Sequence, residues 1–149
     1  MTSIDIDEAG MADIEPAAAL FDAYRQFYRL PSDIEACRAY LRERIGHGES
    51  RVFLARRGGK AVGFMQLYPS YSSLSLRRVW ILYDLFVDSA ARQAGVGRRL
   101  LERAHALGVA SGASELTLST AIDNRAAQLA YERLGWVRDE AFYCYTRAL

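Results

Sequence analysis

The stretch over residues 79–101 places the tightest constraint on how this chain can fold. An apolar run over residues 79–87, broken only by Asp84, gives way to a loop of small residues, and from Gly95 onward the apolar residues take helical spacing. A strand therefore leads into a helix across a turn that contains Gly95 and Gly97. Such a turn gathers free backbone N–H groups at the positive end of a helix dipole, so it can bind an anion.

Other glycine-rich loops fit this turn less well, but they remain alternatives. A phosphate-binding P-loop needs Lys and then Ser or Thr after its last glycine, whereas Arg98 and Arg99 follow Gly97. A dinucleotide-binding fingerprint needs glycine where Leu100 stands, although Glu115 does lie at about the expected distance of ~20 residues. Many strand-to-helix turns also need glycine for steric reasons alone.

Composition limits the classes of protein to be considered. With 149 residues, 51% of them hydrophobic, the chain is expected to form one domain over residues 1–149. A net charge of +1 gives no global field for nucleic acid, and no segment reads as a membrane span or a secretion signal, so we expect a cytoplasmic protein. Cys37 and Cys144 are predicted to be buried free thiols, and no ligand spacing predicts a metal site.

Periodicity predicts the elements of the first half of the chain. Residues 2–7 alternate as a strand, and residues 11–30 have helical spacing that Pro31 stops. Ser32 and Glu35 form a capping box for a second helix, which ends near residue 46. A hairpin over 52–57 and 61–68 is closed by Pro69, and a mobile loop then leads to a long strand over 77–87.

The second half continues with a helix from the glycine turn to about residue 107, a strand over 115–120 and a short helix over 124–134. Gly135 is the expected left-handed cap, and residues 136–147 are predicted to return as a strand or hairpin. The fold class is therefore α/β, with four main helices and a mixed sheet. An antiparallel meander over 50–88 should be joined by parallel strands.

Arg92 precedes the two glycines at a spacing that makes the turn more specific. The run Arg-x-x-Gly-x-Gly over residues 92–97 resembles the pyrophosphate-binding motif of the GCN5-related N-acetyltransferases, the GNAT family. A second segment, from Asn124 to Trp136, looks like that family's second cofactor motif, with Ala130 in place of a larger apolar residue and Trp136 in place of Phe. The order of elements resembles the GNAT fold over nearly the full chain, including strands splayed at the acetyl-CoA site.

The resemblance implies how a co-substrate is held. Acetyl-CoA would bind along a strand and across the turn, and Asn124 would contact its arm. Asn124 and Tyr131 are seven residues apart, which places them on one helical face about 10 Å apart; local roles as a helix cap and a core residue remain alternatives. The implied binding residues are Leu85, Phe86, Val87, Arg92, Gln93, Ala94, Gly95, Val96, Gly97, Arg98, Asn124 and Tyr131.

The implied chemistry is direct transfer of acetyl to an amine, without a metal. Tyr131 matches the position whose hydroxyl protonates the leaving thiolate, and a backbone N–H near Phe86 could stabilise the oxyanion. The positions that carry a catalytic Glu in several family members are Ile81 and Tyr83 here, so Asp84 is the nearby carboxylate left as candidate base. Strand alternation could turn it away from the substrate, in which case a water chain would serve.

The acceptor is expected to be a cationic amine, because tyrosines gather in the segments that the family uses for its acceptor. They are Tyr24, Tyr28, Tyr68, Tyr71 and Tyr83, although Tyr24 and Tyr28 at helical spacing also suit a plain core. The segments around Asp84 and Asn124 look nearest to bacterial relatives of a fungal histone and polyamine acetyltransferase branch.

The expected function is acetyl transfer to a primary amine of a small molecule, amino acid, polyamine or peptide, by a possible homodimer. A non-catalytic acyl-CoA-binding module and a nucleotide-binding regulator are the alternatives.

Overall fold

The computed structural model describes residues 3–149, so Thr2, where the first strand was predicted to begin, lies outside the described residues. The chain forms two compact units, Met1–Leu118 and Ser119–Leu149. The first unit contains one five-stranded sheet whose strands follow their order in the sequence. They are β1 (Ile4–Glu8), β2 (Arg51–Arg57), β3 (Lys60–Ser72), β4 (Arg77–Val87) and β5 (Glu115–Thr117).

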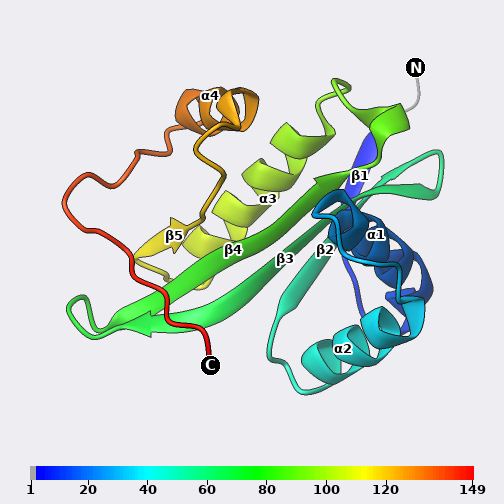
Figure 1. Cartoon of the computed structure of the whole chain (residues 1–149), viewed down its shortest axis with the longest axis horizontal. Helices are drawn as coiled ribbons and strands as arrows, with labels where there is room; N and C mark the ends of the chain where they lie inside the picture. The colour runs from blue at the N-terminus through cyan, green and yellow to red at the C-terminus, as the bar shows by residue number, and fades with distance from the viewer. Residues whose placement is uncertain (1–2) are drawn as a thin grey trace. The chain divides into compact units, whose positions relative to one another are not determined.

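The sheet is mixed, as the sequence predicted. β1 to β4 pair antiparallel, and β5 pairs parallel with β4 at Val79–Ile81. The helices of this unit are α1 (Ile14–Phe27), preceded by one 3₁₀ turn, α2 (Ile34–Gly46) and α3 (Val96–Ala110) (Figure 1). The α/β class and the long strand over residues 77–87 are therefore confirmed.

Helices cover both faces of the sheet, as two neighbouring residues of β3 show. Phe64 stacks on Phe21 of α1 with ring centroids 5.5 Å apart. The next position back, Gly63, faces α3, because a Cβ there would lie 2.9 Å from Val96 and 3.2 Å from Leu100. Successive strand residues point to opposite faces, so α1 and α3 pack on opposite sides. Gly63 lets α3 approach closely.

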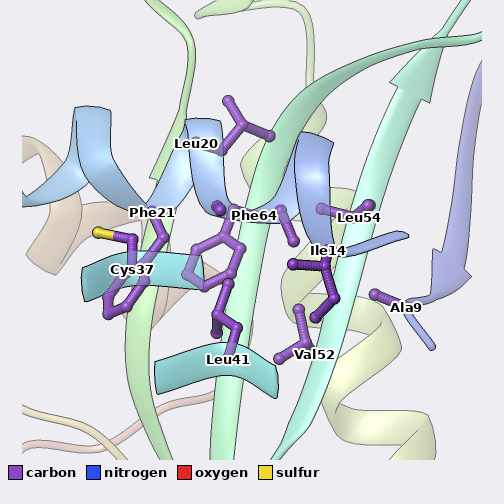
Figure 2. Packing of buried hydrophobic residues seen from close by; sticks show 11 residues of the cluster. Ala9, Ile14, Leu20, Phe21, Cys37, Leu41, Val52, Leu54 and Phe64 are labelled. Carbon is purple, nitrogen blue, oxygen red and sulfur yellow. The ribbon is translucent and has the colours of Figure 1, made fainter. Parts of the chain in front are cut away.

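The core between the sheet and the first two helices contains small and large apolar residues in contact (Figure 2). Phe21 from α1 and Leu41 from α2 meet Phe64 of β3, and Cys37 is buried beside them as the predicted free thiol. Burying such a side chain contributes about 1.5–3 kcal/mol relative to leaving it exposed. This packing fixes the position of α1 over β3 and β4.

The junction between α1 and α2 differs from the predicted capping box. The N-cap of α2 is Asp33, whose side chain accepts a hydrogen bond from the Ala36 N–H. Ser32 instead donates its hydroxyl to Asp22 of α1 at 2.7 Å, and the Asp33 backbone N–H donates to the same carboxylate at 2.8 Å. These bonds hold the pKa of Asp22 below its usual value despite burial. A buried carboxylate thus joins the two helices.

Pro69 does not close β3, contrary to the prediction. The strand continues to Ser72 and pairs with β4 through Pro69 opposite Trp80. β2 ends its pairing at Leu67, so this part of β3 has β4 alone as its described strand partner. Proline is tolerated on such an edge because the missing N–H is not needed by a second neighbour. The predicted mobile loop is consequently shorter than residues 69–76.

The second unit contains α4 (Arg125–Arg133), and Gly135 follows it with a φ of 93°, as predicted for a left-handed cap. Residues 136–147 form neither the predicted strand nor a hairpin. A strand needs a neighbouring strand for its backbone groups, and no described ladder includes this segment. Cys144 is exposed rather than buried for the same reason, because no packed strand carries it inward. β5 also ends at Thr117, three residues before the predicted limit.

Among the described residues, no helix is both long enough and apolar enough to cross a membrane.

Candidate active site

A β-bulge in β4 decides which side chains of this strand face α1. Gln66 of β3 pairs with Asp84 and the next residue, Leu67, pairs with Leu82, so Tyr83 is an extra residue in β4. Bulges of this kind re-aim side chains and are frequent beside active sites. Gln66 lies two residues beyond Phe64 and therefore on the α1 face. Asp84 pairs with Gln66 and therefore lies on that face as well, and its role as the base stays a prediction.

Asp84 is a buried carboxyl group with polar partners. It is 4% exposed, and Gln66 donates its side-chain N–H to Asp84 Oδ2 at 2.9 Å. Burial raises the pKa of Asp84 above its ordinary value, while hydrogen bonds from Gln66 and Tyr24 act in the opposite direction. A carboxylate of raised pKa can accept a proton near neutral pH more readily than an ordinary Asp.

Two of the five predicted tyrosines, Tyr24 and Tyr68, interact with Asp84, and Tyr28 and Tyr83 adjoin them. The Tyr24 hydroxyl interacts with the carboxyl group and donates to the Tyr83 carbonyl at 3.4 Å, and the Tyr28 ring meets the Tyr24 ring edge-on at 5.1 Å. From the other side, Tyr68 and Tyr83 pack edge-to-face at 5.6 Å. Burial and the nearby carboxylate raise the pKa of Tyr24 and of Tyr68, so both hydroxyls stay protonated.

Tyr71 lies apart from this group, on the hairpin between β3 and β4. Arg78 is centred 4.6 Å from its ring and donates to its hydroxyl at 3.1 Å. A cation of the chain itself therefore occupies the ring. The role of Tyr71 in acceptor binding stays a prediction.

Three residues near Asp84 were missed in the sequence. Tyr40 of α2 shares a 2.6 Å hydrogen bond with the Tyr68 hydroxyl, and Ser50 donates to Gln66 at 2.8 Å. A signal was available for Gln66, because it is the polar residue within the apolar run of β3. Tyr40 and Ser50 gave no comparable signal, since their position beside Gln66 and Tyr68 depends on how α2 returns to the sheet.

The glycine turn at the start of α3 is open to a ligand. Gly95 is the N-cap of α3 with a φ of 81°, a conformation that favours glycine, and Gln93 also has a positive φ of 65°. Gly97 is different: a Cβ there would meet Val87 at 4.0 Å and nothing closer. The packing of this unit therefore does not require glycine at 97. The space is available to an anion beside the first N–H groups of α3, which have no partner within the helix.

Arg92 reaches back from the turn to the end of β4. Its Nε donates to the Val87 carbonyl at 3.1 Å, and its guanidinium is centred 5.5 Å from the Phe27 ring and 5.8 Å from the Phe86 ring. Arg98 pairs instead with Glu102 along the helix at 2.9 Å. Of the two arginines, Arg92 thus connects the turn with the strand.

The end of β4 has a backbone edge that no described strand covers. β5 pairs only with Val79–Ile81, so Leu85, Phe86 and Val87 pair with β3 alone. Backbone N–H and C=O groups on such an edge can hydrogen-bond an extended ligand. The edge leads directly to the glycine turn, as Figure 1 shows for β4 and α3.

Comparison with known proteins identifies the family. A sequence model described as the Acetyltransferase (GNAT) family matches residues 17–136. The chain belongs to the GNAT family. It is 42% identical over 142 residues to "Uncharacterized N-acetyltransferase YhfO" of Bacillus subtilis (strain 168), covering 95% of both chains. The chain is accordingly an N-acetyltransferase, as its sequence predicted.

Solved structures agree with this assignment. A crystal structure of a probable acetyltransferase has a TM-score of 0.93 and 39% identity, with 97% of each chain covered. The fold is also shared with aminoglycoside N-acetyltransferase AAC(6')-Iy in complex with CoA, at a TM-score of 0.82 and 22% identity, covering 100% of this chain and 97% of that one. The mixed sheet with α1 and α3 on opposite faces is therefore a GNAT fold.

The second GNAT motif lies in the second unit. Asn124 is the N-cap of α4, and its side chain accepts from the Ala127 N–H at 3.2 Å. Tyr131 is half-buried two turns later, with its ring 6.1 Å from Trp136. The structure thus shows local contacts for both residues, and their roles toward acetyl-CoA stay predictions.

Proposed function

We propose that this GNAT enzyme transfers acetyl from acetyl-CoA to a cationic primary amine and that Asp84 is its general base. The observation that carries the proposal is a buried carboxyl group of raised pKa surrounded by Tyr24, Tyr68 and Tyr83. Tyrosine rings and one carboxylate attract a cation, whereas the same residues provide little attraction for an anionic acceptor.

The reaction requires a base because the acceptor arrives protonated. An alkylamine has a pKa near 10.4, and its nitrogen can attack a carbonyl only after losing a proton. An Asp of ordinary pKa is a weak base at neutral pH. Burial of Asp84 reduces that mismatch, because it raises the pKa of the carboxyl group.

The donor is expected to bind along the free edge of β4 and across the glycine turn. The N–H groups at the start of α3 and the guanidinium of Arg92 suit a pyrophosphate. Gly97 supports this, since its missing Cβ leaves room that the packing of the unit does not use. A backbone N–H near Phe86 or Val87 is the proposed donor to the carbonyl oxygen as it gains charge.

The proposed steps conserve protons and bonds. Asp84 takes a proton from the ammonium group, directly or through one water, and the neutral nitrogen then forms the new C–N bond to the thioester carbonyl. The C–S bond breaks, and the thiolate takes a proton from Tyr131, as the GNAT motif implies. The amide nitrogen releases its second proton, and exchange with water restores the protonation states of Asp84 and Tyr131.

An acceptor panel tests the proposal. Acetyl-CoA would be offered with polyamines, free amino acids, aminoglycosides and lysine peptides, and thiol release followed from pH 6 to 9. We expect amines without a carboxylate to have the highest kcat/KM and the rate to rise with pH. Turnover confined to uncharged alcohols or carboxylate-rich amines, or a rate that is flat with pH, would contradict the cation and deprotonation account.

The remaining expectations concern the whole chain. We infer that residues 1–149 act as one acetyltransferase domain, on a small-molecule or peptide amine. A homodimer and a cytoplasmic location stay predictions from the sequence. Analytical ultracentrifugation and cell fractionation measure them directly.

A further inference from the structure

A chain of buried side-chain hydrogen bonds runs from β2 to β4 beneath the tyrosines. Ser50, at the residue before β2, donates its hydroxyl to Gln66 Oε1 at 2.8 Å, and Gln66 donates through Nε2 to Asp84 Oδ2 at 2.9 Å. Ser50 and Gln66 are 5% and 0% exposed. Such a polar chain is costly to bury unless every group is satisfied, so it calls for an explanation.

The orientation of the Gln66 amide follows from the Asp84 carboxylate. An amide side chain can be turned over, which would exchange its oxygen and nitrogen. A carboxylate only accepts hydrogen bonds, so the NH₂ group of Gln66 must point at Asp84, because the reverse orientation would place two acceptors against each other. A hydroxyl can donate or accept, and Ser50 donates to the remaining Oε1. Ser50 thus satisfies the amide oxygen while Gln66 supplies the donor to Asp84.

We propose that Ser50 and Gln66 are positioning residues for Asp84: they hold its carboxyl group on the α1 face and favour its charged, proton-accepting form. This rests on the proposed role of Asp84 as general base. Gln66 binds Oδ2, which leaves Oδ1 outside this bond. Because the bulge at Tyr83 interrupts regular strand pairing at this point, a side-chain bond to β3 is what fixes the orientation of the carboxyl group.

Several ionisable groups face Asp84 and would contribute to its titration. Tyr24 from α1 and Tyr68 from β3 interact with it directly, and Tyr28 and Tyr83 adjoin Tyr24. Tyr68 also interacts with two residues of α2, through a hydrogen bond with Tyr40 and electrostatically with Arg44. Tyr24 and Tyr68 stay neutral in the working range, because burial raises the pKa of both hydroxyls. Removing the Gln66 donor must then raise the pKa of Asp84 further, because the donor stabilises the charged form.

The test compares Gln66→Met with a matched control. Gln66→Met keeps the size of the side chain and removes the donor. We expect its kcat/KM to fall at the acidic end of the pH profile by up to tenfold, since a hydrogen bond to a charged group is worth about 1.5 kcal/mol or more, and the deficit to close as pH rises. Gln26→Met removes the same kind of bond, from Gln26 to Asp22 at 3.1 Å, and should leave the pH profile unchanged.

A carbon NMR titration of the Asp84 carboxyl group, assigned by its absence in Asp84→Asn, makes the test independent of activity. We expect Asp84 to titrate at higher pH in Gln66→Met than in the wild type, with a smaller shift in Ser50→Ala and none in Gln26→Met. Ser50→Ala also serves if Gln66→Met fails to fold. An unchanged titration in both site variants would overturn the inference. A wild type inactive on every amine would overturn the proposed function instead.

Discussion

The glycine turn and the surroundings of Asp84 are built in opposite ways. The turn consists of consecutive residues between β4 and α3, and what it offers a ligand is mostly backbone N–H. The surroundings of Asp84 are assembled from α1, α2, β3, β4 and the residue before β2, and what they offer is side chains around one buried carboxyl group. One region therefore depends on local conformation and the other on tertiary packing.

This difference indicates what a substitution in each region should affect. Changes in the turn should alter donor binding and leave the core intact, because residues 92–95 are exposed. Changes around Asp84 should affect chemistry and stability together, because the same burial that raises its pKa also disfavours its charge. Single substitutions in each region separate these effects.

Asp84→Asn should lower kcat/KM by roughly 10²- to 10⁴-fold, the usual contribution of a general base. The same variant should have a higher melting temperature at pH 7.5. A raised folded-state pKa means that the contribution of Asp84 to stability is complete below its unfolded pKa and is lost as pH rises through the folded value. Asp84→Asn removes the charge and so restores this stability, and each kcal/mol regained should raise the melting temperature by roughly 3 °C.

Scanning calorimetry at pH 4 and pH 7.5 checks the sign, since the advantage of Asp84→Asn should shrink at pH 4. Asp5→Asn, at an exposed position in β1, is the control and should change neither quantity. A variant that keeps full activity would remove Asp84 from the role of base.

Tyr131→Phe should reduce kcat by roughly 10²-fold with little change in the affinity for acetyl-CoA, if its hydroxyl protonates the leaving thiolate. Steady-state kinetics with a good acceptor and calorimetric titration of the donor measure the two quantities. Equal kcat values for variant and wild type would leave Tyr131 as a packing residue beside Trp136.

Gly97→Val should abolish the rise in melting temperature that acetyl-CoA produces in the wild type. The added side chain finds only Val87 nearby, at 4.0 Å from the new Cβ, so the variant should fold and lose the ligand alone. Gly10→Val is the matched control, because nothing lies within 4 Å of its Cβ position and its backbone is extended. A full thermal shift in Gly97→Val would mean that the turn is merely structural.

The smallest effects should distinguish two exposed tyrosines. Tyr28→Ala should raise KM for a cationic amine about two- to fivefold, the value of an exposed cation–π contact, whereas Tyr71→Ala should leave KM unchanged because Arg78 occupies its ring. Both effects are read from initial rates at varied acceptor concentration. A higher KM in Tyr71→Ala would return that residue to the acceptor site.

The sequence predicted what local patterns determine. The strand over residues 77–87, the helix after Gly95 and the order of elements as far as α4 follow from periodicity and turn residues, and they are confirmed. Residues 136–147 show the limit of such predictions, because a β-prone composition alone does not supply the partner strand that a strand needs. The link between Ser50, Gln66 and Asp84 could not be predicted, since it depends on the register of three strands and on one extra residue in β4.

The bulge at Tyr83 also affects how the two ends of β4 are related. From Val87 to Asp84 the pairing with β3 is regular, so Phe86 and Asp84 point to one face of the sheet and Val87 and Leu85 to the other. The extra residue at Tyr83 then reverses this alternation, and Ile81, which lies opposite Tyr68, points to the same face as Asp84. Residues an odd number of positions apart on the two sides of the bulge therefore share a face, and counting in steps of two across Tyr83 assigns the side chains of β4 to the wrong one.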